Sequence, residues 1–404
     1  MDDKHFIRKI LIAIVLGVLA GFLFKDYVSI LDVVGKVFLR TMQMVIPLLV
    51  LGQVIQALGS LEKKDLSALG IRTITIFGIS SLLAAYWGIL FTLVMQPGKS
   101  VTIPQSGLET IEEQTIDLSE TIISFFPQNI MDSLSRGSII QIIIFAIFMG
   151  IAVNIFASQK ENNLFLPLLK EFNAIIMQVI RLVMKFAPIG IFSMIAVSVG
   201  NLGLEILLPM VQYLLVFGLA TLTFLLLWVV IIGLYSKKSF KSIIVGMKNI
   251  SIMALATTSS AVTLPLAMED SHAKLGISKR VVDLVLPMGV SLNSNGSAMH
   301  MAITVVTIAQ LYNISLDGMS LLYIGVLATF ISLANAVVPG AGLVSLAIIV
   351  PQLGLPIESI ALFAGVEWFV GMLRTITNVN SDVFSAVIVD KMSNIRPEEL
   401  ENGI

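Results

Sequence analysis

The stretch Glu367–Phe384 reads EWFVGMLRTITNVNSDVF, and it decides the fold class of this chain. It follows the apolar run IALFAGV and continues into SAVIVD, so the whole segment is long enough to cross a membrane as a helix. Yet it carries Arg374, Asn378 and Asp382 at intervals of four residues. A helix places residues with this spacing on one face. The stretch therefore predicts a membrane helix with one polar face.

Composition supports a membrane protein. Of the 404 residues, 56% are hydrophobic and only 13% are charged, whereas about a quarter of the residues of a soluble domain are charged. The net charge of −1 gives no general attraction to nucleic acid. The chain has no cysteine, which excludes disulfides and thiolate metal sites, and its three histidines are scattered. No cofactor is expected.

Apolar runs of about 20 residues predict eight membrane spans. They lie near Phe6–Phe24, Leu31–Leu58, Thr73–Met95, Ile122–Ala157, Phe165–Val199, Ile206–Leu234, Val281–Leu311 and Ile357–Val389. The first has no small-residue cleavage site and is read as a span, not a signal peptide. Two further apolar stretches, Ser242–Ala267 and Gly318–Leu353, have small, polar and proline residues at their centres. Each is either a proline-kinked helix or a re-entrant hairpin whose tip holds a ligand.

The charges of the loops favour the hairpin interpretation. With two hairpins and the N-terminus inside, all the basic loops lie inside: 62–72, 158–163, 235–241, 272–280 and the C-terminal tail. The acidic loop 98–120 then lies outside. This is the positive-inside pattern, and making either stretch a full span would break it. We therefore expect a multi-pass protein of the cell membrane with both termini cytoplasmic.

The two hairpin candidates also form an inverted repeat. Each precedes a span with polar residues at its middle, and the first enters from inside while the second enters from outside. Inverted repeats with broken helices at the midplane are typical of secondary transporters, whose substrate sites lie at the repeat interface.

The middle of the span Val281–Leu311 reads LPMGVSLNSNGSAMHMA. Asn293, Asn295 and Gly296 are poor helix formers placed in mid-span. They could simply hydrogen-bond to neighbouring helices. Alternatively, they mark an unwound turn whose carbonyl groups coordinate a cation, since hard cations prefer oxygen ligands.

The last span raises a similar choice. Arg374 and Asp382 would each cost at least about 2.5–3.5 kcal/mol at the bilayer centre. Arg374 could pair with Asp382 or Glu367 and lock helices together. It could instead bind a substrate carboxylate through its forked donors, with Asn378 and Asp382 holding a cation beside Asn293. The second interpretation makes the polar face the wall of a transport site.

Several motifs resemble those of the glutamate transporter family, the dicarboxylate/amino acid:cation symporters. RTITNVNSD (374–382) resembles its RTxxNVxGD signature, and NSNGS (293–297) lies where the family has NMDGT. TTSSAVTLP (257–265) and VVPGAGLV (337–344) are similar to its two hairpin tips. APIGIFSMIA (187–196) and the segment 70–98 are similar to further family segments. The resemblance covers nearly the whole chain in the correct order.

The resemblance implies an all-α polytopic membrane protein with eight transmembrane helices, two re-entrant hairpins and inverted repeats. The family forms homotrimers and works by an elevator mechanism, in which a transport domain moves against a scaffold. The scaffold would comprise 1–69 and the fourth and fifth spans within 99–234, the segment that also contains the outer loop and span six. The transport domain would comprise 70–98 and 235–391, followed by a cytoplasmic tail, 392–404.

The resemblance also implies the site residues. The substrate would contact Arg374, Thr375, Asn378, Ser260, Ser297 and Val337, beside Gly371 and a gate formed around Pro339, Gly340 and Gly342. One cation site would use Gly289, Asn293, Asn378 and Asp382. A second would use Ser291, Ser332, Leu333 and Asn335, and a third Ser80, Ser81, Asn293 and Asn295. The expected partners are a small carboxylate substrate, Na⁺ or H⁺, and the lipid bilayer.

The chain departs from the family pattern at informative positions. Gly371 replaces the aspartate that usually holds the substrate's amino group, and an unpaired ammonium would be poorly compensated in a dry site. A C4-type dicarboxylate is therefore favoured over an amino acid, although Glu367 could substitute for the aspartate. Asn295 replaces an aspartate and Ser294 a methionine, which weakens the third cation site and adds doubt about the second. His300 either packs or titrates near neutral pH.

Other classes of function are less compatible with these residues. An ion channel would share the hairpins and the charges. The inverted repeat and the single arginine of the last span, Arg374, favour a carrier. An enzyme would need a nucleophile with a nearby base or a metal cluster, and neither is present in the sequence. Within the carriers, an acidic or neutral amino-acid symporter is the alternative to a dicarboxylate symporter.

Overall fold

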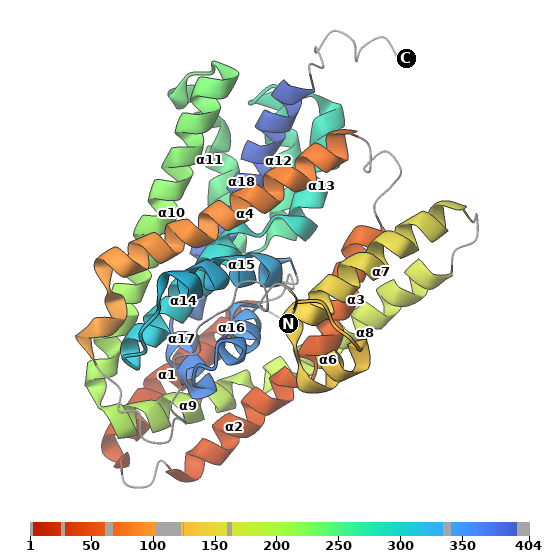
Figure 1. Ribbon diagram of the computed structural model, residues 1–404. Coiled ribbons are helices and arrows are strands. Elements are labelled where there is room, and N and C mark those ends of the chain that lie inside the picture. The colour runs from red at the N-terminus through yellow and green to blue at the C-terminus, as the bar shows by residue number, and fades with distance from the viewer. Residues whose placement is uncertain are drawn as a thin grey trace.

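The computed structural model describes residues 3–25, 29–60, 68–101, 123, 125–159, 164–333 and 341–393. These residues form helices and no strand (Figure 1). The first half contains α1 (Asp3–Leu23), α2 (Ser29–Gln43), α3 (Ile46–Gly59), α4 (Ala68–Met95), η2 (Pro97–Ser100), α6 (Ile130–Arg136), α7 (Ile139–Gln159), α8 (Phe165–Lys185), α9 (Ala187–Leu202) and η3 (Leu204–Ile206). The second half contains α10 (Leu207–Ser236), α11 (Phe240–Thr257), α12 (Ser260–Ala273), α13 (Lys279–Leu292), α14 (Asn295–Leu311), α15 (Gly318–Ser332), α16 (Ala341–Gln352), η4 (Ile357–Ser359), α17 (Ile360–Ala364) and α18 (Glu367–Met392).

The helices pack in two sets. In one, α9 lies against α1 and α2, while α3 lies against α7 and α8. In the other, α18 is surrounded by α10, α11, α13 and α14, and α4 runs along α14 (Figure 1). The helices α15, α16 and α17 connect the sets through contacts with α7, α2 and α9. The polar helix predicted from the sequence is thus enclosed by other helices, which shields its charged side chains from lipid.

A helix that crosses a membrane must be both long and apolar. Four helical segments qualify in the described part of the chain: Leu69–Ser100, Ile139–Ala157, Leu207–Ser236 and Phe240–Thr257. Two bent pairs raise the number to six: Phe165–Val183 with Ala187–Val197, bent by 51°, and Ile357–Ala364 with Glu367–Met392, bent by 86°. The all-helical class agrees with the sequence interpretation, and the count of eight spans with two hairpins stays a prediction.

Several stretches expected as single spans are broken. Ile357–Val389 turns sharply between α17 and α18, and Leu31–Leu58 is interrupted at Met44–Val45, where a proline begins α3. Proline suits the first turn of a helix because its missing N–H needs no partner there. Ile122–Ala157 is interrupted at Gly137, which has φ 68° and ends α6. A left-handed glycine is a common helix terminator, because it lacks the Cβ that would clash.

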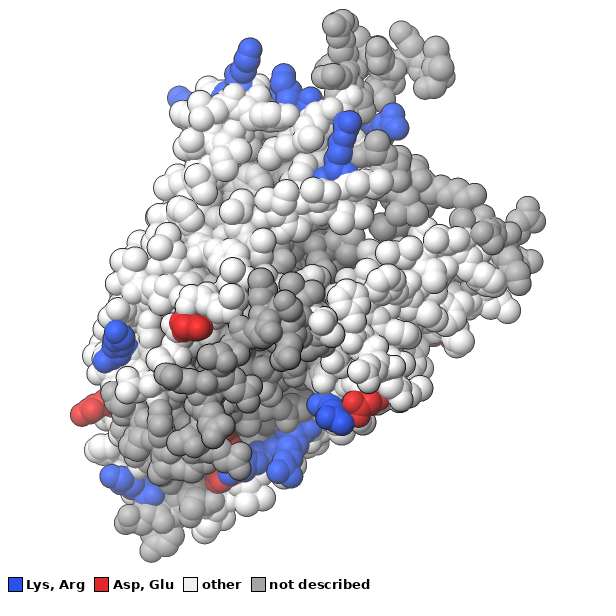
Figure 2. Space-filling model, in the orientation of Figure 1, with Lys and Arg blue, Asp and Glu red and all other residues white. Residues whose placement is uncertain are grey.

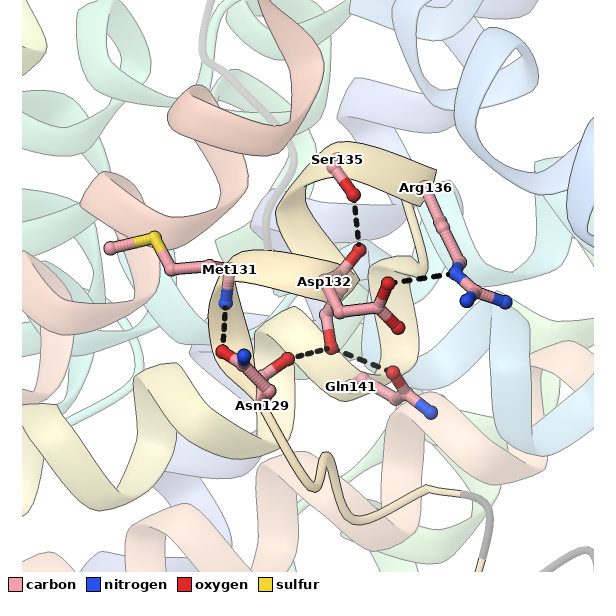
Figure 3. Close-up of polar contacts among 7 residues, drawn as sticks. Asn129, Met131, Asp132, Ser135, Arg136 and Gln141 are labelled. Atoms are coloured by element: carbon pink, nitrogen blue, oxygen red, sulfur yellow. Dashed lines mark hydrogen bonds and ion pairs between the residues drawn. The ribbon is translucent and has the colours of Figure 1, made fainter.

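The short helix α6 is held by its own polar residues (Figure 3). Asn129 caps it, since its side-chain oxygen accepts a hydrogen bond from the N–H of Met131 at 2.9 Å. Arg136 pairs with Asp132 across one turn, with Nε 2.9 Å from Oδ1. The carbonyl of Gly137 then accepts a hydrogen bond from Nε2 of Gln352, at the end of α16, at 3.0 Å. The α6–α7 corner and α16 are therefore joined directly.

Basic loops meet at one end of the molecule. Arg72 of α4 donates to the carbonyl of Met392 at 3.0 Å, Ser278 donates from its backbone to Asp390 at 3.1 Å, and Lys238 donates to the carbonyl of Leu275. Figure 2 shows Lys and Arg side chains gathered at this end, where α18 finishes. The loops 235–241 and 272–280 thus lie together, as the predicted topology requires.

Candidate substrate and cation site

The predicted unwound turn is present between α13 and α14. Asn293 and Ser294 have non-helical backbone angles, φ −118° and ψ 89° for the first and φ −114° and ψ 55° for the second. The N–H of Asn293 still bonds to the carbonyl of Gly289 at 2.9 Å, which ends α13. Asparagine and serine tolerate such angles better than apolar residues because their side chains hydrogen-bond locally. The break therefore creates a helix N-terminus, that of α14, inside the protein.

This helix N-terminus crosses α18 at very close range. A Cβ added to Gly296 would lie 2.2 Å from the carbonyl oxygen of Arg374, so the crossing requires a residue without a side chain. The N–H of Gly296 donates to Oδ1 of Asn378 at 2.7 Å. Asn378 thereby satisfies one of the free N–H groups that begin α14. The crossing therefore fixes the position of Arg374 along α18 relative to the break between α13 and α14.

Gly296→Ala is expected to disrupt this crossing severely. The added methyl group meets backbone rather than a movable side chain, so the two helices must separate. We expect the free energy of unfolding to fall by about 3 kcal/mol. The expected result is loss of folded protein in a detergent thermal-shift measurement. The control is Gly78→Ala, because nothing lies within 4 Å of a Cβ at Gly78 in α4. If both variants melt like the parent protein, the close approach is wrong.

Arg374 forms a buried ion pair with Glu367. The two residues lie seven positions apart on α18, with Nη1 of the arginine 3.2 Å from Oε1 of the glutamate, and their side chains are 9% and 11% exposed. The same oxygen accepts a hydrogen bond from the N–H of Gly342, near the start of α16, at 3.1 Å. The other carboxylate oxygen, Oε2, is buried and has no hydrogen-bond partner among the described residues. A carboxylate is thus held by a guanidinium and a helix N-terminus together.

A second polar group joins α4 to the α13–α14 break. Ser81 donates to Oδ1 of Asn295 at 2.7 Å, and Ser80 lies within hydrogen-bond distance of both Asn295 and Asn293, at 3.2 and 3.3 Å. All four side chains are buried. The nitrogen of the Asn295 amide has no acceptor among the described residues. The residues expected at the third cation site therefore do meet, but Asn295 contributes an amide in place of a charge.

Asp382 lies beside the same break. Its Oδ1 accepts a hydrogen bond from Nδ2 of Asn293 at 2.8 Å, and its side chain is 3% exposed. A Cβ on Gly289 would lie 2.5 Å from the carboxyl carbon of Asp382, so α13 and α18 approach closely here. An isolated buried carboxylate is costly unless a cation or a proton neutralises it. The described residues contain no cluster of three or more His, Cys, Asp or Glu side chains. The available ligands are oxygens, which suit Na⁺.

The other predicted site residues are placed as follows. Thr375 and Ser297 are buried near the α14–α18 crossing, and Ser260 begins α12 after the capping residue Ser259. Gly371 has open space around it: the nearest atom to an added Cβ would be Nη2 of Arg374, at 3.9 Å. Ser332 is buried and donates to the carbonyl of Thr329, Leu333 ends α15, and Ser291 is exposed. Asn335, Val337, Pro339 and Gly340 lie outside the described residues. The structure therefore brings together the first and third cation sets more clearly than the second.

The sequence alone missed an aromatic cluster that joins α10, α14 and α17. Tyr213 of α10 is fully buried, its hydroxyl lies 2.9 Å from that of Thr304, and its ring packs edge-on against Phe363 at 4.9 Å. His300 packs near Phe217, and neither of its ring nitrogens has a hydrogen-bond partner among the described residues. No pattern in the sequence links α10 to α14 and α17, because these contacts join helices that lie far apart in the chain.

Comparison with known proteins identifies the family. Residues 6–392 match the sodium:dicarboxylate symporter family. The chain belongs to the sodium:dicarboxylate symporter family. It is 32% identical to a proton/glutamate-aspartate symporter of Bacillus subtilis (strain 168), over 95% of this chain and 94% of that protein. It is 28% identical to a C4-dicarboxylate transport protein of Serratia proteamaculans (strain 568), over 96% of this chain and 92% of that protein. The resemblance stated from the motifs is confirmed.

Members of this family are transporters, so the site is interpreted as a transport site and not as an active site. Relatives of both substrate types are similar over nearly their whole length, including a proton/glutamate-aspartate symporter of Escherichia coli (strain K12) at 30% identity, over 95% of this chain and 92% of that protein. The family therefore leaves the choice between a dicarboxylate and an acidic amino acid to the residues of the site.

Proposed function

We propose that this protein is a secondary active symporter that moves a small dicarboxylate, of the C4 type, together with Na⁺. The observation that carries the proposal is the carboxylate cradle formed by Nη1 of Arg374 and the N–H of Gly342. Arginine's planar donors suit carboxylates, and a helix N-terminus favours anions. Glu367 uses this cradle in the structure, so a substrate carboxylate would find the same donors.

The residues of the break would hold the coupling ion. Asp382 and Asn293, with the carbonyl of Gly289, offer oxygen ligands and one negative charge about two helical turns along α18 from Arg374. Asn378, Thr375 and Ser297 would provide the remaining polar contacts near the substrate. The group formed by Ser80, Ser81 and Asn295 would bind a cation weakly, because the amide nitrogen of Asn295 repels positive charge. A proton would then be the second coupling ion in place of a second Na⁺. Relatives named as proton or proton/sodium symporters make either ion reasonable.

An acidic amino acid is the second candidate substrate. Gly371 supplies no carboxylate for an amino group, which favours a plain dicarboxylate. However, Oε2 of Glu367 is buried, has no hydrogen-bond partner among the residues that the structure describes, and could accept a hydrogen bond from an ammonium group. A buried acceptor of this kind is normally satisfied. Glutamate and aspartate are therefore the substrates to test beside succinate and malate.

The larger machinery is proposed from the family. The scaffold and transport domains, with boundaries at 69, 98, 234 and 391, would move by the elevator mechanism within a homotrimer. The packing of α18 against α10, α11, α13 and α14, and of α9 against α1 and α2, is compatible with such a division. Multi-pass insertion in the cell membrane with both termini cytoplasmic completes the proposal.

Uptake into liposomes tests the proposed function. Purified protein would be reconstituted, and uptake of radiolabelled succinate and aspartate measured with an inward Na⁺ gradient and with choline in its place. The expected result is succinate uptake that requires Na⁺. Aspartate uptake without succinate uptake would replace the dicarboxylate by the amino acid, and uptake of neither would reject both substrates. Passive flux of ions without a substrate requirement would instead indicate a channel.

A further inference from the structure

The carboxylate of Glu367 occupies the position that a substrate carboxylate would need. It contacts the guanidinium of Arg374 on α18 and the backbone of Gly342 on α16 at the same time, at 3.2 and 3.1 Å through one oxygen. A Cβ on Gly342 would lie 2.2 Å from Nη1 of Arg374 and 2.4 Å from both carboxylate oxygens. The start of α16 therefore lies directly on the ion pair.

We propose that Glu367 is an internal stand-in for the substrate carboxylate. In the unloaded transporter it neutralises Arg374 and tethers α16 over the site, and an incoming substrate carboxylate displaces it from Arg374. The inference rests on the proposed function, because it assigns to Glu367 the part of that site which the substrate takes over.

The charges explain why an unloaded site needs such a group. Arg374 is buried, and a buried guanidinium without a counter-charge costs several kcal/mol. A symporter that accumulates substrate must return across the membrane empty after each delivery. Glu367 supplies the missing negative charge during that return, and its bond to Gly342 holds the start of α16 over the site without substrate.

The geometry argues against a purely structural ion pair. A pair that only joined parts of α18 would not need α16, yet the shared oxygen bonds to Gly342. A permanent buried carboxylate is expected to have both oxygens satisfied, whereas Oε2 of Glu367 has no partner among the described residues. The contact is therefore incomplete as a structural pair, which suits a group that is released in each cycle.

The first test separates exchange from net uptake. Exchange of external labelled substrate for internal unlabelled substrate uses only the loaded transporter, whereas net uptake also needs the empty return. Glu367→Gln keeps an acceptor for Gly342 but removes the charge. We expect net uptake of succinate to fall by about tenfold relative to exchange, since a charged hydrogen bond is lost. The matched control is Glu358→Gln, an exposed carboxylate on η4. Equal changes in exchange and net uptake, or no change in either, would overturn the proposal.

The second test needs no transport and so separates failure of this inference from failure of the proposed function. The chain has no cysteine, so Val344→Cys places a single thiol on α16, at a buried position two residues after Gly342. In buffer without substrate, adding Glu367→Gln to this background should speed modification by a small thiol reagent about tenfold, because the bond that holds Gly342 of α16 loses its charged acceptor and is weaker. Glu367→Asp, which keeps the charge on a shorter side chain, serves if the glutamine variant does not fold. Unchanged labelling with either substitution would reject the tether.

Discussion

Arg374→Ala is expected to lower succinate or aspartate uptake by about a hundredfold or more, because truncating one partner of a buried charge pair costs at least about 2–5 kcal/mol. The side chain of Arg374 is 9% exposed, and its guanidinium lies 3.2 Å from the carboxylate of Glu367. Arg374→Lys should recover only part of the activity, since an ammonium keeps the charge but loses the planar fork. Initial uptake rates in liposomes, at equal amounts of reconstituted protein, measure both effects.

Two controls show whether the loss concerns binding. Arg280→Ala removes an exposed arginine at the start of α13 and should leave uptake unchanged. Arg374→Ala also leaves Glu367 buried without its partner, which by itself destabilises the protein. The double variant Arg374→Ala/Glu367→Gln removes that stranded charge, so it should recover thermal stability without recovering uptake. Wild-type uptake in the Arg374→Ala variant would show that the arginine is only structural.

The sequence predicted the parts of the site that depend on local chemistry. A run of Asn, Ser, Asn and Gly in mid-span is enough to predict the break at Asn293–Ser294, since such residues disfavour helix wherever they occur. The spacing from Arg374 to Asp382 likewise predicts one polar face. The basic loops 235–241 and 272–280 lie together near the end of α18, and the sidedness of the other loops stays a prediction.

The remaining features depend on tertiary packing. The sequence left Arg374 with two possible acidic partners, Glu367 and Asp382, because both lie on or near its helix face. Only the position of α16 selects Glu367, by adding the N–H of Gly342. The 86° bend before α18 and the crossing at Gly296 are also set by neighbouring helices, which no local pattern encodes. The gate residues around Pro339 stay a prediction.

Asp382→Asn is expected to remove the dependence of uptake on Na⁺, with a loss of about a hundredfold in uptake at a fixed Na⁺ gradient, as for other buried charges that lose their counter-ion. The substitution is nearly isosteric, and the new side-chain oxygen can still accept the hydrogen bond that Asn293 donates at 2.8 Å. The packing of Gly289 against this side chain is also preserved. The fold should therefore survive while the negative charge that attracts the cation is lost.

The measurement is the initial rate of succinate uptake as a function of external Na⁺, with choline keeping the ionic strength constant. Asp283→Asn, an exposed carboxylate on α13, is the matched control and should behave like the parent protein. If the Asp382→Asn variant keeps the parent Na⁺ dependence, Asp382 does not hold the coupling ion. If uptake loses its Na⁺ dependence but stays fast, a cation bound at Asp382 is not required for fast uptake. Only a joint loss of rate and Na⁺ dependence supports a cation held between Asp382 and Asn293, where a buried carboxylate lies beside the break between α13 and α14.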